Sequence, residues 1–447
     1  MSNVQFAHQA HPYIVPKRKL ILYQGKNVMK LKLLLIFLAL IVSFTGCNLS
    51  GSRTGGDDST DLRLCDGWGS EPTPDLVALL DIFAGENPSV NIIRYTNPDC
   101  FPALITTGVA DSFWVGVGAQ LIGTWVQTGD ILPVTSIFND NDWLSNYRSE
   151  VIDLVSQNGE IWSVPLNIHR LNVLWYNKQI FADNSLTPPV TLSDFFTVAS
   201  DIDLLGITPL AISSEGIWAV TLLFESVLLA YMSPAKYRGL WNGTTEWDGT
   251  EVQNALNDVV DIFSYVNTNH ADIEWVGAAQ LLADGDAAMF IMADWTNSFL
   301  KANNLTPNVD YGWAPSPGTS GSYLMTCGSF AFCAKAPNSA NAVKWLTICG
   351  SKEGQDAFNP IKGSIPARKD YDPSLYDEYL LDAMDDYAVS EIVPISWGGA
   401  ASDNWAHAIR RVIDKFVVDI EDAGITKGQA VSTAQAGLVQ AYIDYGN

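Results

Sequence analysis

The chain has 447 residues, of which 47% are apolar and 17% are charged. This composition excludes a disordered chain, and the length predicts two or three domains or lobes. With 49 acidic and 25 basic residues the formal net charge is −24, which disfavours binding to nucleic acid or to an anionic membrane surface.

The N-terminal region has the pattern of a secretory signal. Met29-Lys30-Leu31-Lys32 precedes the run LLLIFLALIVSFTGC, which is too short for a membrane-spanning helix. The run ends at Thr45-Gly46-Cys47, which resembles a bacterial lipobox with Phe44 in place of the usual leucine. We predict a signal peptide over 1–46, with an extended or spurious start before Met29, and lipidation of Cys47. Residues 47–60 would form a flexible tether. An ordinary signal peptide with a chance cysteine is the alternative.

Cysteine and histidine usage is compatible with a location outside the cytoplasm. Five cysteines follow Cys47, which allows one or two disulfides, and we favour the pair Cys65–Cys100 because each lies near the end of a predicted strand. Only three histidines follow Cys47, without the spacing of metal ligands. We therefore expect no metal site and no cofactor.

Apolar runs and helical patterns alternate along the chain, which predicts an α/β fold with a largely parallel sheet. The predicted strands are 62–65, 91–95, 111–115, 172–176 and 287–292. The predicted helices are 75–86, 119–128, 192–200, 215–232, 251–267, 340–349 and 406–422.

Tryptophans follow three of the predicted strands, where ligands bind in open α/β sheets. Trp68 comes after the first strand, Trp114 ends the third, and Trp295 follows the strand over 287–292. Core packing explains any one of them, but three at corresponding positions favour a binding site. A sugar ring stacks its C–H face on an indole while polar groups bind its hydroxyls, so a sugar ligand fits this pattern.

Four sequence motifs resemble those of a known protein family. They are Ser163-Val164-Pro165 with Leu174-Trp175-Tyr176-Asn177-Lys178, Gly285-Asp286-Ala287-Ala288-Met289 with Asp294-Trp295, the run 311–318 (YGWAPSPG), and the run 351–355 (SKEGQ) leading into 358–370 (FNPIKGSIPARKD). In this order they resemble bacterial extracellular solute-binding proteins of the sugar type, over residues 61–447. The run 169–172 (HRLN) and the run 358–370 are most similar to glucose/mannose-type members.

The resemblance implies an α/β, two-lobe, periplasmic-binding-protein-like (type II) fold, with a hinge and a ligand cleft between the lobes. Lobe 1 would comprise 61–168 plus 329–370, and lobe 2 would comprise 171–327 plus 371–447. The protein would be a monomeric, lipid-anchored, extracytoplasmic receptor of an ABC importer. It would deliver a mono- or oligosaccharide to membrane permease subunits served by a cytoplasmic ATPase, and it would be no enzyme.

Candidate ligand-binding residues follow by matching motif positions, with one addition from a predicted loop. They are Trp68, Glu71, Trp114, His169, Arg170, Trp241, Asp294, Trp295, Lys362 and Trp397. Trp114 stands where glucose-type relatives often have glutamine, and Trp397 where they often have histidine, which leaves the sugar open. Trp241 is the added, weaker candidate. A purely structural hinge pair (His169-Arg170), a helix N-cap (Asp294) and a surface lysine (Lys362) are the alternative readings.

The run FNPIKGSIPARKD looks like part of a phosphate loop, but its lysine precedes its glycine and Ile365-Pro366 requires extended backbone. We predict a loop that offers Lys362 to the cleft. Rival functions are a binding protein for a polyamine or another non-sugar solute, a ligand-presenting sensor, and a glycosidase using Glu71 and Asp294. A serine hydrolase is weaker still because no G-x-S-x-G motif occurs.

Overall fold

The computed structural model describes residues 60–68 and 72–446. The predicted signal peptide, Cys47 and Glu71 lie outside these residues, as does the predicted tether up to residue 59. Within the described part, no helix is both long and apolar enough to cross a membrane.

The larger sheet has eight strands in the order β13-β7-β12-β3-β1-β2, with β14 and β4 also paired to β12. Its strands are β1 (Asp61–Cys65), β2 (Asn91–Tyr95), β3 (Ser112–Val115), β4 (Ile131–Leu132), β7 (Ser163–Arg170), β12 (Ser322–Cys333), β13 (Ile365–Pro366) and β14 (Glu391–Pro394). All eight residues of β7 are buried, and β12 is buried except for Phe332, so these two strands form the centre of the core.

The second sheet has four strands in the order β11-β8-β10-β9. Its strands are β8 (Val173–Asn177), β9 (Thr208–Ala211), β10 (Ala287–Ile291) and β11 (Tyr311–Pro315), and a separate hairpin pairs β5 (Ser156–Gln157) with β6 (Glu160–Ile161). The chain passes from the first sheet to the second after Arg170, and it returns between Pro315 and Ser322.

Both large sheets are mixed, which corrects the expectation of a largely parallel sheet. β1 runs parallel to β2 and β3, but β12 runs antiparallel to β3 and β7. In the second sheet β8 runs antiparallel to both β10 and β11, and β9 runs parallel to β10. The reason is that β12 returns from the second sheet and inserts into the first between β7 and β3.

Helices surround the sheets. The α-helices are α2 (Pro74–Glu86), α3 (Phe101–Thr106), α4 (Gly118–Gln120), α5 (Thr135–Asp140), α6 (Ser149–Leu154), α7 (Lys178–Asp183), α8 (Leu192–Asp203), α9 (Ile217–Tyr231), α10 (Pro234–Asn242), α11 (Thr250–Ile262), α12 (Trp275–Asp284), α13 (Trp295–Ala302), α14 (Ser339–Gly350), α15 (Lys352–Lys362), α16 (Glu378–Val389), α17 (Asp403–Glu421) and α18 (Lys427–Tyr445). Short 3-10 helices are η1 (Pro98–Cys100), η3 (Leu144–Asn146), η4 (Phe263–Tyr265), η5 (Pro373–Leu375) and η6 (Ser396–Gly398), and η2 (Leu121–Val126) is a π-helix.

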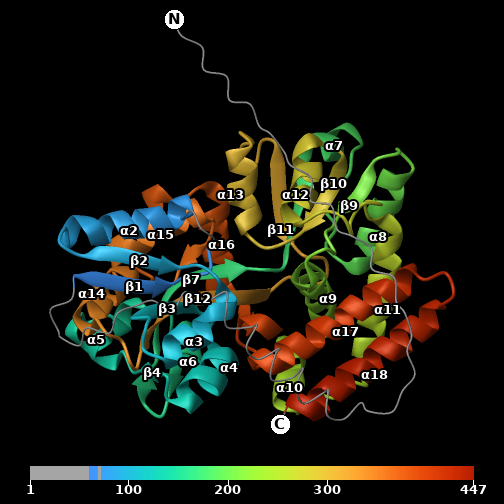
Figure 1. Cartoon of the computed structure of the whole chain (residues 1–447). Helices are drawn as coiled ribbons and strands as arrows, with labels where there is room; N and C mark the ends of the chain where they lie inside the picture. Colours follow the sequence, from blue (N-terminus) through green and yellow to red (C-terminus); the bar gives the residue numbers. More distant parts are fainter. Residues whose placement is uncertain (1–59, 69–71, 447) are drawn as a thin grey trace, which may run out of the picture. The chain divides into compact units, whose positions relative to one another are not determined.

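Two helical groups matter for the site. Near the first sheet, α2 packs against α15, and α14 contacts both helices as well as β7 and β12 (Figure 1). Near the C-terminus, α17 packs against α9 and α18, and α11 joins α9 and α18 (Figure 1). α17 is amphipathic, with Trp405, Ile409 and Ile413 buried on the face that packs inward.

The run FNPIKGSIPARKD is only partly a loop, which corrects the prediction. Phe358 to Lys362 form the last turns of α15, with Pro360 inside the helix. Gly363 ends the helix with a φ of 79°, a conformation that favours glycine. Ile365–Pro366 is extended, as predicted, and pairs with β7 as β13.

The predicted disulfide Cys65–Cys100 is wrong, because Cys65 is a free, fully buried thiol. Cys65 lies within the first sheet, where its neighbours across β2 and β3 are Tyr95 and Phe113. Its side chain is therefore part of the core.

Candidate ligand-binding cleft

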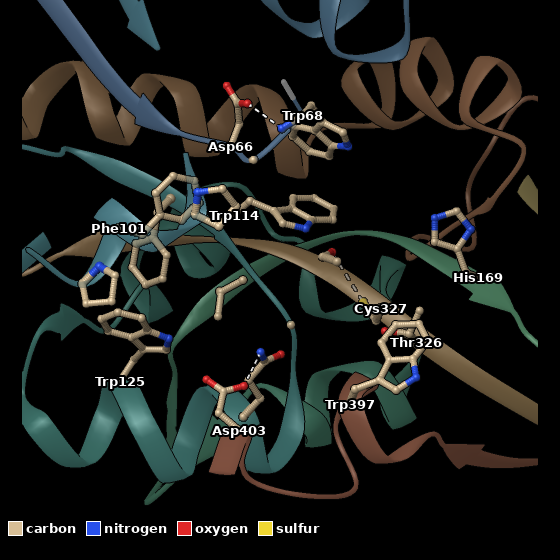
Figure 2. Close-up of a pocket in the computed structure, with 18 of the residues that line it drawn as sticks. Asp66, Trp68, Phe101, Trp114, Trp125, His169, Thr326, Cys327, Trp397 and Asp403 are labelled. Atoms are coloured by element: carbon tan, nitrogen blue, oxygen red, sulfur yellow. Dashed lines mark hydrogen bonds between the residues drawn. The ribbon is translucent and has the colours of Figure 1, made fainter. Parts of the chain in front are cut away.

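A cavity of about 650 Å³ gathers side chains from distant parts of the chain (Figure 2). Its aromatic lining consists of Trp68, Phe101, Phe113, Trp114, Trp125, Trp295 and Trp397. Its polar and charged lining consists of Asp66, Gln120, His169, Thr326, Lys362, Asp403, His407 and Arg410. Six of the predicted ligand-binding residues are therefore brought together: Trp68, Trp114, His169, Trp295, Lys362 and Trp397.

Trp68 and Trp114 form one aromatic pair in the wall of the cavity. Figure 2 shows the two indoles side by side, and their ring centres lie 4.5 Å apart. Trp114 also meets Phe330 edge-on at 5.3 Å. Trp114 lies at the end of β3, opposite Phe330 of β12. A Cβ atom at Gly328 would come within 1.8 Å of the Trp114 ring. A glycine is therefore required at this point of β12 for the indole to keep its position.

Asp66 fixes the loop that carries Trp68. Its carboxylate accepts hydrogen bonds from Arg94 Nε at 2.6 Å and from Arg94 Nη2 at 2.8 Å. It also accepts the backbone N–H of Trp68 at 3.0 Å. Since Asp66 is almost fully buried, this two-bond ion pair offsets its charge and sets the direction of the chain after β1.

His169 and Asp294 form a buried pair between the two sheets. His169 Nδ1 lies 2.5 Å from Asp294 Oδ1, and the second Asp294 oxygen accepts the backbone N–H of Arg170 at 2.8 Å. Asn167 Nδ2 lies 2.8 Å from His169 Nε2, so Asn167 donates there while Nδ1–H donates to Asp294. Burial raises the pKa of Asp294, and the nearby His169 opposes that shift.

Asp294 therefore acts by holding His169. Its side chain makes no N-cap hydrogen bond to α13, although it occupies the N-cap position, so the alternative capping role is not seen. The next residue, Trp295, meets the His169 ring edge-on at 5.0 Å and lines the cavity. The segment from β10 to the start of α13 thus places the Trp295 indole in the cavity wall and the Asp294 carboxylate behind that wall.

Arg170, unlike His169, does not line the cavity. It is 2% exposed, its guanidinium donates to the Asp386 carboxylate, and it lies over the Tyr323 ring. Arg170 therefore ties the segment between the two sheets to α16. The structure separates the predicted pair: His169 faces the cavity and Arg170 supports the surrounding packing.

Lys362 reaches the cavity from the C-terminal end of α15. Its Nζ lies 3.5 Å from Asp75 Oδ2 and 5.7 Å from the centre of the Trp68 ring. Gly363 turns the chain immediately afterwards, and a Cβ there would approach Ser298 Oγ to 2.5 Å. The end of this helix is therefore tightly positioned, and Lys362 adds a cation next to an aromatic face.

Trp397 is held in the cavity wall by a buried carboxylate that sequence reasoning missed. Glu225 on α9 is fully buried and accepts hydrogen bonds from Ser396 N at 3.0 Å, Ser396 Oγ at 2.5 Å and Tyr237 Oη at 2.5 Å. Burial raises the pKa of Glu225 to about 7, against the opposing effect of these donors. The turn that carries Trp397 is thus anchored from behind by one carboxylate.

Trp241 was predicted to bind the ligand, but it does not line the cavity. It is 8% exposed and packs edge-on against Trp247 at 5.1 Å and Trp405 at 5.2 Å. Packing between α10 and α17 accounts for this tryptophan.

Several lining residues were not predicted from the sequence, among them five on helical segments. They are Trp125, Gln120, Asp403, His407 and Arg410. They lie on helical segments rather than at the strand ends where ligands usually bind in open α/β sheets. A usable signal exists for three of them, because Asp403, His407 and Arg410 are spaced four and three residues apart and so share one helical face.

The geometry suits a small molecule with an apolar ring face and a polar rim. Indole faces offer stacking surface, while histidine, lysine, threonine and carboxylate groups offer donors and acceptors around it. Across residues 60–68 and 72–446, no group of three or more His, Cys, Asp or Glu side chains is arranged to hold a metal ion.

Comparison with known proteins identifies the family. The sequence pattern of the bacterial extracellular solute-binding proteins matches residues 86–356. A Pyrococcus horikoshii protein described as an uncharacterized ABC transporter extracellular-binding protein is 34% identical over 337 residues, which cover 74% of this chain and 73% of that protein. A probable sugar-binding periplasmic protein of Mesorhizobium japonicum is 27% identical over 285 residues, covering 60% of this chain and 67% of that protein.

The fold agrees with this match. The bacterial solute receptor AcbH, which prefers β-D-galactopyranose, has a TM-score of 0.75 to this chain at 16% identity, covering 86% of this chain and 99% of AcbH. This likeness shows the two-lobe α/β binding-protein fold of type II. The protein is therefore a member of the bacterial extracellular solute-binding protein family.

Proposed function

We propose that the protein is the sugar receptor of an ABC importer and that it binds a mono- or oligosaccharide in the cleft. The observation that carries this proposal is the convergence of Trp68, Trp114, Trp295 and Trp397 on one cavity together with His169 and Lys362. The sugar-binding relative and the galactose-preferring structural neighbour support the same ligand class.

Aromatic rings and polar groups in the cavity would make different contacts with a sugar. The C–H face of a pyranose ring stacks on an indole, and its hydroxyls exchange hydrogen bonds with charged and neutral polar side chains. A cavity of about 650 Å³ falls in the usual size range of small-molecule sites, roughly 300–1,000 Å³. A compact sugar fits this space better than an extended peptide does.

The family places the protein outside the cytoplasm. Beyond that, we propose that Cys47 carries a lipid that anchors the monomeric protein to the bacterial membrane through the tether over 47–60. We further propose that it passes its ligand to permease subunits driven by a cytoplasmic ATPase. Radiolabelled lipid incorporation in the wild type and in Cys47→Ser tests the anchor directly.

The lobe assignment also stays a proposal. Lobe 1 is 61–168 plus 329–370, and lobe 2 is 171–327 plus 371–447. Under this division Trp68 and Trp114 come from lobe 1, while Trp295 and Trp397 come from lobe 2. Hinge closure would then bring the two pairs onto one ligand.

A thermal-shift screen of the purified mature protein tests the sugar proposal. A ligand that binds only the folded state raises the unfolding midpoint once its concentration passes Kd. We expect a rise with one or more mono- or oligosaccharides, and a reduced rise in Trp114→Ala. Trp162→Ala, at a partly buried tryptophan outside the cavity lining, is the control. A shift with a polyamine or a peptide and with no sugar would overturn the proposal, as would hydrolysis of a glycan.

A further inference from the structure

Helix α17 presents three titratable side chains to the cavity. Asp403, His407 and Arg410 all line it from one helical face. Asp403 accepts a hydrogen bond from Gln120 Nε2 at 2.6 Å (Figure 2), and His407 Nδ1 donates to the Asp403 carbonyl oxygen at 2.7 Å. These two side chains therefore have protein partners, and Arg410 differs from them.

Arg410 brings a poorly compensated positive charge to the cavity. Its guanidinium carbon lies 5.6 Å from the centre of the Trp397 ring. Its Nε is buried and has no hydrogen-bond partner among the described residues. Glu225 and Asp403 act on it only through space. Burial lowers the pKa of Arg410, but a guanidinium stays protonated in proteins.

The other full charges around the cavity already have partners. Asp66 is bound through two hydrogen bonds by Arg94. Lys362 lies 3.5 Å from the Asp75 carboxylate. The acceptor sites of Glu225, which sits behind the wall, are taken by Ser396 and Tyr237. Arg410 is thus the lining cation to which no described carboxylate is directly bound.

We infer that the natural ligand carries a carboxylate, as a hexuronic acid unit does, and that Arg410 binds that group. This inference rests on the proposed sugar-binding function and specifies the class of sugar. A guanidinium fork matches a carboxylate with two parallel hydrogen bonds. The Trp397 ring holds Arg410 in place, which favours such a fixed, two-point contact.

Two features oppose an anion and restrict where its carboxylate can sit. Asp403 lines the same cavity, but seven residues along a helix correspond to about 10 Å of rise. The net charge of −24 repels anions, but exposed charges are screened over about 8 Å at physiological ionic strength. The groups inside the cavity therefore dominate, and the ligand carboxylate is expected at the Arg410 end.

The test compares matched acidic and neutral sugars by isothermal titration calorimetry on the mature chain. The pairs are galacturonate with galactose, glucuronate with glucose, and digalacturonate with a neutral disaccharide. We expect the Kd of an acidic sugar to be lower than that of its neutral partner by a factor of about ten or more. Arg410→Gln should bring that preference to about one, and Arg410→Lys should retain part of it because lysine keeps the charge but loses the fork.

Arg411→Gln is the matched control, since Arg411 is the next residue of α17, is exposed and lies outside the cavity lining. It should keep the full preference for the acid. Circular dichroism and thermal unfolding check that each variant folds. Neutral sugars binding as tightly as acids to the wild type would overturn this inference and leave the sugar-receptor function standing. Failure of every sugar to bind, acidic or neutral, would overturn both.

Discussion

Gly328 shows how a single missing side chain shapes the cleft. The Trp114 ring lies directly over it, so a methyl group at 1.8 Å would force the indole or β12 to move. We expect Gly328→Ala to fold but to bind sugar about tenfold more weakly, because a displaced indole loses stacking area. Calorimetric titration measures the loss. Gly85→Ala is the control, since a Cβ at Gly85 meets nothing within 4 Å. Wild-type affinity in Gly328→Ala would mean that Trp114 does not contact the ligand.

Lys362 has two roles that one variant alone does not separate. It lies near the Trp68 ring, where it can meet a ligand, and it partly offsets the buried Asp75 carboxylate. We expect Lys362→Ala to weaken sugar binding about tenfold or more, since a charge-assisted hydrogen bond is lost. Asp75→Asn removes the carboxylate partner but keeps the lysine. If Asp75→Asn weakens binding as much as Lys362→Ala, the lysine acts through Asp75 and the predicted ligand contact is wrong.

At the scale of elements, the sequence predicted those strands that have clear borders. The strands β1, β2, β3, β8 and β10 were placed within a residue or two because each is a short apolar run between polar or glycine-rich turns. β12 was missed because its sequence, SYLMTCGSFAFC, mixes small and apolar residues without alternation. Its identity as a strand comes from partners far away in the chain, including β7 and β3.

The same limits apply to the site. Trp68, Trp114 and Trp295 were found because they follow strands, and Lys362 and Trp397 because of the resemblance to the family. The run 358–370 was predicted to be a loop because of Gly363 and Pro366, but Phe358 to Lys362 belong to the end of α15. Trp241 could be excluded only from its packing against Trp247 and Trp405, which no local pattern reports. The α17 face does have a local signal in the spacing of Asp403, His407 and Arg410, but the spacing alone does not show that this face lines a cavity.

Glu225, which links α9 to the turn that carries Trp397, should make the stability of the folded state depend on pH. Burial raises the folded-state pKa of Glu225 to about 7, above its ordinary value of 4.5. The folded state therefore binds more protons than the unfolded state between these values, and the stabilisation present below pH 4.5 is lost as pH rises through 7. The contribution is on the order of 3 kcal/mol, by the rule of about 1.4 kcal/mol per pKa unit.

We expect the free energy of unfolding of Glu225→Gln to fall less than that of the wild type between pH 5 and pH 8. Glutamine keeps the size of the side chain and an acceptor oxygen, but it does not titrate. Urea denaturation at closely spaced pH values measures the difference. Glu251→Gln, at a carboxylate outside the cavity that pairs with Lys236, is the control. Parallel pH profiles for Glu225→Gln and the wild type would show that this carboxyl does not titrate in that window.

At the scale of the whole molecule, the two sheets and the connections between them make closure around a ligand the expected motion. Cys327 reports on it, because this free thiol lines the cavity from β12 and is 1% exposed. Burial also raises the pKa of Cys327, so its reaction with a thiol reagent requires the cleft to open. A bound ligand that holds the cleft closed should slow this reaction in proportion to 1 + [ligand]/Kd, about a hundredfold at 100 Kd.

Mass spectrometry after timed maleimide labelling follows each cysteine separately. Cys65, Cys333 and Cys349 are also free and buried, but they do not line the cavity, so they report on global unfolding and supply an internal control. Their labelling should be slow throughout and should fall with ligand only as far as overall stability rises. Cys327 should react faster than these three without sugar and approach them with sugar. Equal labelling of all four in the absence of sugar would mean that the cleft does not open independently of unfolding, and ligand entry would then need another route.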